Sequence, residues 1–181
     1  MIMPHDKLTL PPGFPFHGKI MSDCPHPLTQ VKVGSHVVFV GAAADLTTKD
    51  IAAARITLYV PLSHELVRVP PEVMIRPAPL PDFGGVPDNW RQIVDELVGE
   101  VERGTRLMFH CIAGHGRTGT MLASLIAVME PDTADPIAVV RKRYCSHAVE
   151  TTAQARAIFA LRNEQLPPSY RGKFPGDAFA M

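Results

Sequence analysis

The feature that most constrains this chain is the ten-residue stretch HCIAGHGRTG, which runs from His110 to Gly119. A short apolar run at residues 107–109 leads into it, and small and apolar residues follow it as far as Met129. This pattern predicts a buried strand, a tight loop and the N-terminus of a buried helix. Such a loop directs successive backbone N–H groups and the positive end of a helix dipole at one point, which suits an anion the size of phosphate.

Cys111 and Arg117 stand at the two ends of this loop. A thiolate at such a position is stabilised and becomes a nucleophile, whereas the alternative is an inert buried cysteine. The planar fork of an arginine donates to two phosphate oxygens at once. The remaining predicted phosphate-binding residues are Ile112, Ala113, Gly114, His115 and Gly116. The side chain of His115 is expected to face either substrate or solvent.

Length and composition indicate one globular domain. The chain has 181 residues, of which 46% are hydrophobic and 20% charged, and its formal net charge is +0. This balance argues against binding of nucleic acid or membrane through bulk charge. Three widely spaced cysteines do not form a disulfide framework and fit a reducing compartment. With no apolar signal core near its start and no run long enough to span a bilayer, the chain is expected to be cytoplasmic.

Strand-like and helix-like segments alternate, which predicts an α/β fold with a mostly parallel sheet. The expected strands are residues 37–40, 56–60, 73–75 and 106–110. The expected helices are residues 48–55, 89–102, 118–129, 135–144 and a last one that starts at Thr151 or Thr152. Three regions follow: a proline-rich arm packing on the domain (residues 1–30), a catalytic domain (31–166) and an irregular tail (167–181).

Three segments, taken in order, resemble the cysteine-based protein tyrosine phosphatases, in the small dual-specificity branch. The pattern His-Cys-x5-Arg-Thr-Gly at residues 110–119 looks like the signature of that superfamily. Leu80 to Phe83 is similar to the loop that carries its general acid, and Ala148 to Gln154 to a downstream segment whose glutamine orients water. The resemblance covers roughly residues 37–161. It implies a central, mostly parallel sheet flanked by helices on both faces.

The resemblance also implies a role for each matching residue. Cys111 would attack phosphorus and form a phosphocysteine, while Arg117 holds the phosphoryl oxygens. Asp82 would protonate the leaving group as general acid. Thr118 would donate a hydrogen bond to the departing thiolate, and Gln154 would position water for the second step.

Three further residues keep two interpretations each. His110 either lies under the loop and supports it by a hydrogen bond, or is an ordinary core histidine. Glu150 either holds Arg117 by an ion pair or is an exposed carboxylate at a helix entry. Asp88 is a second candidate for the general acid, although a helix cap for residues 89–102 is the simpler interpretation.

No metal and no other cofactor is expected. His17, Cys24 and His26 lack the paired short spacings of a zinc site, and the predicted chemistry needs no metal. Cys145 stands where the family often carries Arg-Pro. One hypothesis is that oxidised Cys111 is trapped by Cys145, or by Cys24, as a disulfide; the simpler alternative is a buried cysteine.

The predicted function is hydrolysis of phosphomonoesters on a phosphorylated protein or peptide, most readily phosphotyrosine, with phosphoserine or phosphothreonine also accepted. One alternative is a phosphoinositide or RNA 5′-phosphatase, and another is a phosphopeptide-binding module without turnover. Ile112 and His115 occupy positions where loops suited to polyanions carry lysines, which counts against the first. Cys111 and Asp82 together count against the second. No nucleic-acid or membrane partner is expected, and the oligomeric state is left open.

Overall fold

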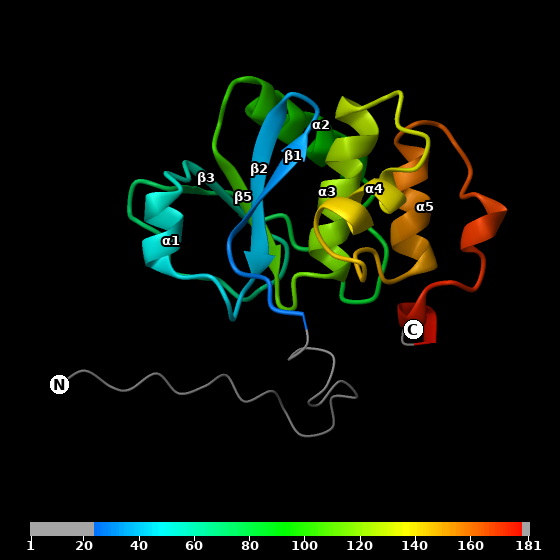
Figure 1. Ribbon diagram of the computed structural model, residues 1–181, viewed down its shortest axis with the longest axis horizontal. Coiled ribbons are helices and arrows are strands. Elements are labelled where there is room, and N and C mark those ends of the chain that lie inside the picture. The colour runs from blue at the N-terminus through cyan, green and yellow to red at the C-terminus, as the bar shows by residue number, and fades with distance from the viewer. Residues whose placement is uncertain (1–23, 179–181) are drawn as a thin grey trace.

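The computed structural model describes residues 24–178 as a five-stranded sheet with helices on both faces (Figure 1). The strands are β1 (Thr29–Val33), β2 (His36–Ala42), β3 (Leu58–Pro61), β4 (Met74–Ile75) and β5 (Leu107–Cys111). They lie in the order β1-β2-β5-β3-β4, with only β1 antiparallel to its neighbour. The predicted α/β class with a mostly parallel sheet is confirmed.

The helices are α1 (Thr48–Ala53), α2 (Trp90–Glu102), α3 (Gly116–Met129), α4 (Pro136–Arg143) and α5 (Thr152–Ala160). Side chains of Thr47, Asp135 and Thr151 cap α1, α4 and α5 by accepting first-turn N–H groups, which settles where these helices begin. Asp88 is not the cap of α2, because that position belongs to Asn89, whose side chain makes no capping bond. No helix among the described residues is long and apolar enough to cross a membrane.

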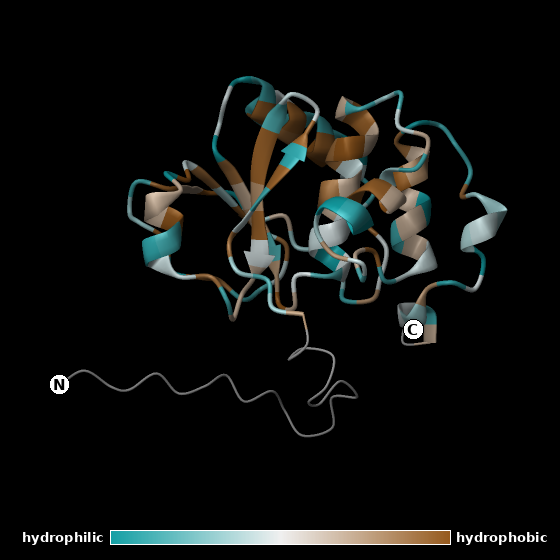
Figure 2. Ribbon diagram, in the orientation of Figure 1, coloured by the Kyte–Doolittle hydropathy of each residue, from teal (hydrophilic) through white to brown (hydrophobic). Residues whose placement is uncertain are grey.

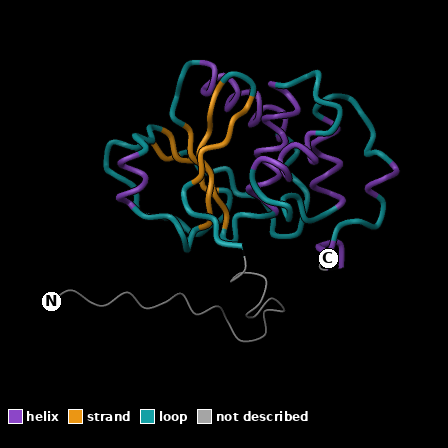
Figure 3. The backbone as a smooth tube through the Cα atoms, viewed as in Figure 1, coloured by secondary structure: helices purple, strands orange, loops and turns teal. Residues whose placement is uncertain are grey.

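The two faces of the sheet are covered differently because side chains alternate along each strand. Leu107 and Phe109 of β5 belong to the larger core, which packs under helices α2 to α5. Met108 points to the opposite face, where it joins a smaller core with Ile51 of α1. Most of the helical layer therefore lies on one side of the strands (Figure 3). The helix α3 is central to this layer and hydrophobic over most of its length (Figure 2).

The strand β1 was not foreseen by the sequence analysis. Its first two residues, Thr29 and Gln30, fall inside the predicted arm of residues 1–30, yet they pair with β2 in an antiparallel hairpin. Gly34 makes the tight turn possible because it adopts a φ of 58°, which side chains disfavour. Of the predicted arm, residues 1–23 lie outside the described part of the chain.

The tail is more ordered than the sequence predicted. Its described part forms two 3₁₀ turns, η1 (Pro168–Tyr170) and η2 (Pro175–Ala178). Tyr170 and Phe174 join the larger core, with their rings stacked 5.6 Å apart. Asp177 accepts bonds from both the backbone N–H and the hydroxyl of Thr152, each at 2.6 Å. These two aromatic side chains, and not backbone propensity, give the tail its position.

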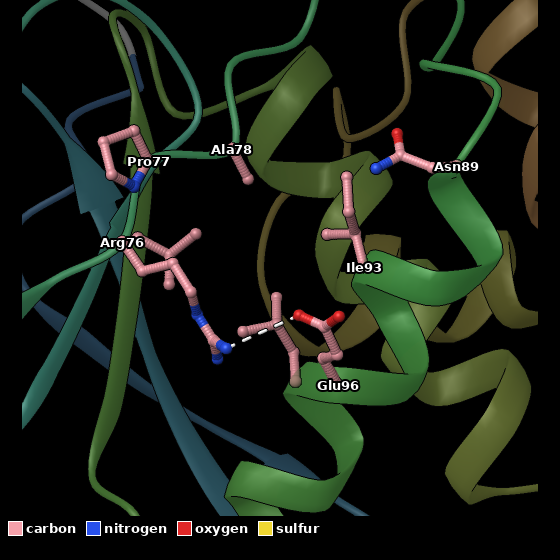
Figure 4. A pocket seen from close by; sticks show the side chains of 8 residues that line it. Arg76, Pro77, Ala78, Asn89, Ile93 and Glu96 are labelled. Carbon is pink, nitrogen blue, oxygen red and sulfur yellow. Dashed lines mark ion pairs between the residues drawn. The ribbon is translucent and has the colours of Figure 1, made fainter.

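A pocket beside the sheet edge shows how β4 is tied to the helical layer (Figure 4). It lies between the residues that follow β4 and the face of α2 that carries Ile93, Glu96 and Leu97. Arg76 reaches across it, with Nη1 3.5 Å from Oε2 of Glu96. Both side chains are more than a third exposed, so this pair contributes at most about 1 kcal/mol. The pocket contains none of the predicted site residues.

Candidate active site

The predicted phosphate-binding loop joins the end of β5 to the start of α3. Cys111 is the last residue of the strand, and Arg117 lies in the first turn of the helix, where only 8% of it is exposed. Gly114 has a φ of 78°, and a Cβ there would lie 2.9 Å from the hydroxyl of Tyr144. A larger residue at this position would therefore be strained and would collide with its neighbours.

Several groups hold the loop by its carbonyls. The backbone N–H of Ala43, just after β2, donates to the carbonyls of Cys111 and Ile112 at 3.0 and 3.1 Å. The hydroxyl of Tyr144, at the end of α4, donates to the carbonyl of Gly114 at 2.8 Å. Carbonyls that are engaged by surrounding groups leave the amide N–H groups available for an anion at the centre of the loop.

Thr118 contacts the predicted nucleophile directly. Its hydroxyl donates to Sγ of Cys111 at 3.2 Å, and both residues are buried. A hydroxyl donor in a buried site stabilises a thiolate more than the same bond does in water. The hydroxyl therefore lies where the role expected for Thr118 requires it.

Asp82 lies beside the guanidinium of Arg117. Its Oδ1 is 3.2 Å from Nη2 of Arg117, and its side chain is 41% exposed. Asp82 precedes Phe83, which turns the chain with a φ of 51°. Asp88 lines a different pocket, between the start of α2 and the end of α5. Of the two candidate acids, the structure brings Asp82 to Arg117.

Glu150 and Gln154 also approach the loop, but not in the expected pairing. Among the described residues, Arg117 forms its ion pair with Asp82, whereas the carboxylate of Glu150 accepts the backbone N–H of Gly116. Gln154 is 1% exposed, and its Oε1 accepts the backbone N–H of Glu150 at 2.9 Å. Burial, reinforced by the charge of Asp82, raises the pKa of Glu150 to about 7 despite the opposing influence of Arg117.

The ring of His110 contacts the backbone at the start of the loop, which fits the first of its two interpretations. Its Nδ1 is 3.1 Å from the carbonyl oxygen of Cys111, which accepts only, so Nδ1 carries the proton. Its Nε2 then accepts from the hydroxyl of Tyr59 at 2.5 Å, and that hydroxyl accepts the N–H of Val67 at 3.2 Å. Burial lowers the pKa of His110, which keeps the ring in this neutral form.

The side chain of His115 faces neither substrate nor solvent, contrary to expectation. It is 3% exposed, and its Nδ1 lies 3.1 Å from Nε2 of His26 and 3.2 Å from Sγ of Cys145. Burial, with smaller contributions from His26 and His147, lowers its pKa to about 4. The backbone of His115 therefore belongs to the phosphate loop, but its ring belongs to a separate cluster.

The three cysteines are free. The sulfur of Cys111 bonds with Thr118, whereas the thiol beside Cys145 is that of Cys24, with the two sulfur atoms 3.6 Å apart. The structure thus gives Cys145 a different close neighbour from the one in the disulfide hypothesis.

Sequence reasoning missed three residues that hold the loop. The sequence places Tyr59 in a predicted strand and Tyr144 at the end of a predicted helix, and it gives Ala43 no role. None carries a local signal, because a tyrosine in a strand is normally read as core. Only the arrangement of the elements shows that these groups reach the loop.

The comparisons with known proteins agree with this geometry. Residues 38–170 match the sequence model of the family described as PTP-SAK, the DSP-PTPase phosphatase domain of Swiss Army Knife proteins. The chain belongs to this family. The PTP-SAK domain is therefore a cysteine-based phosphatase of the dual-specificity type, which confirms the resemblance inferred from residues 110–119.

Two uncharacterized proteins of Methanocaldococcus jannaschii are similar in sequence. MJECL20 is 33% identical over 104 residues, which are 56% of this chain and 69% of that protein. MJ0215 is 36% identical over 96 residues, which are 52% of this chain and 58% of that protein, so less than two thirds of its length is covered.

Solved structures share the fold at low sequence identity. Kinase associated phosphatase, with its catalytic cysteine replaced by serine, has a TM-score of 0.61 at 17% identity, covering 76% of this chain and 95% of that one. Tk-PTP in its active form has a TM-score of 0.60 at 21% identity, covering 74% and 96%. Human DUSP28 has a TM-score of 0.54 at 15% identity, covering 77% and 94%.

The hydrogen-bond chain under the loop can be tested with Tyr59→Phe. The change leaves Nε2 of His110 buried without a donor, so we expect the free energy of unfolding to fall by about 1–3 kcal/mol. Urea denaturation of the wild type and variant measures the difference. Equal stability would show that Tyr59 contributes packing but no useful hydrogen bond.

The raised pKa of Glu150 predicts a specific pH dependence of stability. Between the ordinary value of 4.5 and about 7, the folded protein binds more protons at this carboxyl than the unfolded chain, so stability is lost as pH rises through this range. Glu150→Gln stays neutral and should lack this component, whereas Glu72→Gln, at an exposed glutamate, should keep it. Unfolding free energies measured from about pH 5 to about pH 8 decide the matter; parallel curves for wild type and Glu150→Gln would contradict it.

Proposed function

We propose that this PTP-SAK domain hydrolyses phosphomonoesters on proteins through a phosphocysteine formed on Cys111. The observation that carries the proposal is the 3.2 Å contact between Arg117 and Asp82. Cys111 and Arg117 belong to the same loop, and Asp82 contacts Arg117. The loop therefore brings together a proposed nucleophile, a phosphate-binding guanidinium and a proposed acid. A phosphoryl group held by the loop has all three within reach.

In the first step, the thiolate of Cys111 attacks phosphorus as the P–O bond to the leaving group breaks. The loop amides and the guanidinium of Arg117 hold the phosphoryl oxygens, where charge accumulates in the transition state. Asp82 donates its proton to the departing oxygen. Its partial exposure supports this role, because the acid must reach a leaving group that extends out of the loop.

In the second step, water attacks the phosphocysteine and the P–S bond breaks. Asp82, now a carboxylate, accepts a proton from the water, and the products are inorganic phosphate and the Cys111 thiolate. The hydroxyl of Thr118, 3.2 Å from that sulfur, stabilises the thiolate as it leaves. Gln154 is the proposed water-positioning residue. Its side chain is buried, and its Nε2 lies beside Gly116 of the loop.

The loop surface favours a phosphoprotein substrate over a polyanion. Ile112 and Ala113 are its half-buried side chains, and the ring of His115 is turned into the neighbouring cluster. Arg117 is then the sole cation that the loop itself offers. A phosphoinositide or an RNA 5′ end carries further phosphates, which additional cations would have to neutralise. Phosphotyrosine, with phosphoserine and phosphothreonine as further substrates, fits this surface better.

Cys111→Ser tests the covalent mechanism. We expect it to abolish turnover of p-nitrophenyl phosphate while keeping the affinity for inorganic phosphate, because the loop amides and Arg117 remain. Calorimetric phosphate titration and a rate assay measure the two properties. Appreciable turnover by this variant would exclude a phosphocysteine, and absence of turnover by the wild type would leave only a binding module.

Asp82→Asn tests the assignment of the acid, with Asp88→Asn as its matched control. We expect Asp82→Asn to lose about 10²–10⁴ in kcat for phenyl phosphate, and less for substrates with better leaving groups. The alkaline limb of the pH–rate profile should also disappear, since it reports an acid that must stay protonated. If Asp88→Asn shows this pattern instead, the acid has been assigned to the wrong loop.

A further inference from the structure

A second cluster of reactive side chains lies beside the phosphate loop. It consists of Cys24 and His26, which precede β1, His115 of the loop, and Cys145, which follows α4. Their ligand atoms all lie within 4.8 Å of one another, and all but Cys24 are buried. The phosphatase mechanism uses none of these four side chains. The sequence also suggested His17, with Cys24 and His26, as a possible metal ligand; His17 lies outside the described residues.

The separations match a single small coordination sphere. Sγ of Cys24 is 3.2 Å from Nε2 of His26, which is 3.1 Å from Nδ1 of His115. That nitrogen is 3.2 Å from Sγ of Cys145, which is 3.6 Å from Sγ of Cys24. Tetrahedral zinc with ordinary Zn–S and Zn–N bond lengths separates its ligands by about 3.3–3.8 Å. Four of the six separations thus lie within a few tenths of an ångström of zinc geometry, and all six lie within 4.8 Å.

We propose that Cys24, His26, His115 and Cys145 form a tetrahedral zinc site. Two sulfurs and two imidazole nitrogens are a donor set typical of structural zinc. On binding, the two thiols release their protons, and the two thiolates balance the dication, so the occupied site is neutral. A neutral centre suits a buried position, where an unbalanced charge would be costly.

The arrangement is hard to explain by hydrogen bonds alone. Four atoms with lone pairs point into one space, but neutral thiols and imidazoles have few protons to share among them. One cation satisfies all four at once. Nε2 of His115 is buried without a hydrogen-bond partner among the described residues, so the polar contacts of this ring are made through Nδ1, toward the cluster.

Neighbouring groups hold the ligand segments in place. The backbone N–H of His26 donates to Asp45 at 2.7 Å, and the backbone N–H of His147 donates to Sγ of Cys145 at 3.4 Å. The ring of Tyr144 packs against that of His26, with their centroids 4.9 Å apart. Outer contacts of this kind orient metal ligands and raise the affinity of a site.

The site would fasten three distant segments around the phosphate loop. His115 lies between Cys111 and Arg117 in the sequence, so a metal on its ring anchors the loop through a side chain that the phosphatase mechanism does not use. His115 is in this sense a positioning residue, and zinc takes no part in phosphoryl transfer. Metal binding stands independently of the proposed function; only its effect on phosphate affinity rests on that function.

The test is metal content and coordination in the full chain produced in zinc-supplemented cells. We expect elemental analysis to find close to one zinc ion per chain. Cys24→Ser and Cys145→Ser should lose most of it, whereas Cys111→Ser, which removes a thiol outside the cluster, should retain it. Three free thiols should be titrated after unfolding in chelator without reductant, matching the three cysteines of the sequence.

Cobalt reconstitution keeps the test decisive if a serine variant fails to fold. Wild-type protein and Cys111→Ser loaded with Co²⁺ should both show thiolate-to-cobalt charge transfer and the intense visible bands of tetrahedral coordination. Chelator-stripped wild type should bind inorganic phosphate more weakly and melt at a lower temperature. A loss of zinc with unchanged phosphate affinity would uphold the site but reject its positioning role.

Three results would overturn the zinc site. The first is wild-type protein from zinc-replete cells that holds no zinc and yields no tetrahedral cobalt spectrum. The second is unchanged zinc content in a folded Cys145→Ser variant. The third is a Cys24–Cys145 disulfide in mass maps of the unreduced protein, which would identify the cluster as an oxidisable thiol pair.

Discussion

The turn from β5 into α3 is the constraint on which the rest of the structure depends. A strand with no exposed face ends at Cys111, and a helix buried over most of its length begins at Gly116. Neither element can shift without disturbing a close-packed core. The loop between them is therefore held by the whole domain, which is the condition for amide groups that bind a transition state without reorganising.

The loop is held from separate parts of the chain. Ala43 reaches it from the end of β2, His110 and Tyr59 support it through the sheet, and Tyr144 bonds it from the end of α4. The tail acts one step further out, because the N–H of Gly176 donates to the carbonyl of Glu150 at 2.9 Å. Loop geometry is thus a property of tertiary contacts distributed over most of the described chain.

Side chains of the same loop belong to two different groups of residues. Cys111, Thr118 and Arg117 form the proposed phosphoryl site, whereas the ring of His115 joins the cluster of cysteines and histidines. The segment before β1, outside the predicted catalytic domain, thereby becomes part of the loop's support.

The sequence by itself determined the strand, loop and helix around residues 110–119, the α/β class and most helix starts. Glycines flanked by a buried strand and helix have few other conformations, and capping residues such as Thr151 act within a few positions of themselves. Only the tertiary structure decided which groups meet at the site. It gave Arg117 the partner Asp82 in place of Glu150 or Asp88, and brought Cys24 to Cys145 across 121 positions. Local sequence patterns encode backbone conformation. Contacts between side chains that are distant in sequence depend on how the helices and strands pack, and no short pattern encodes that packing.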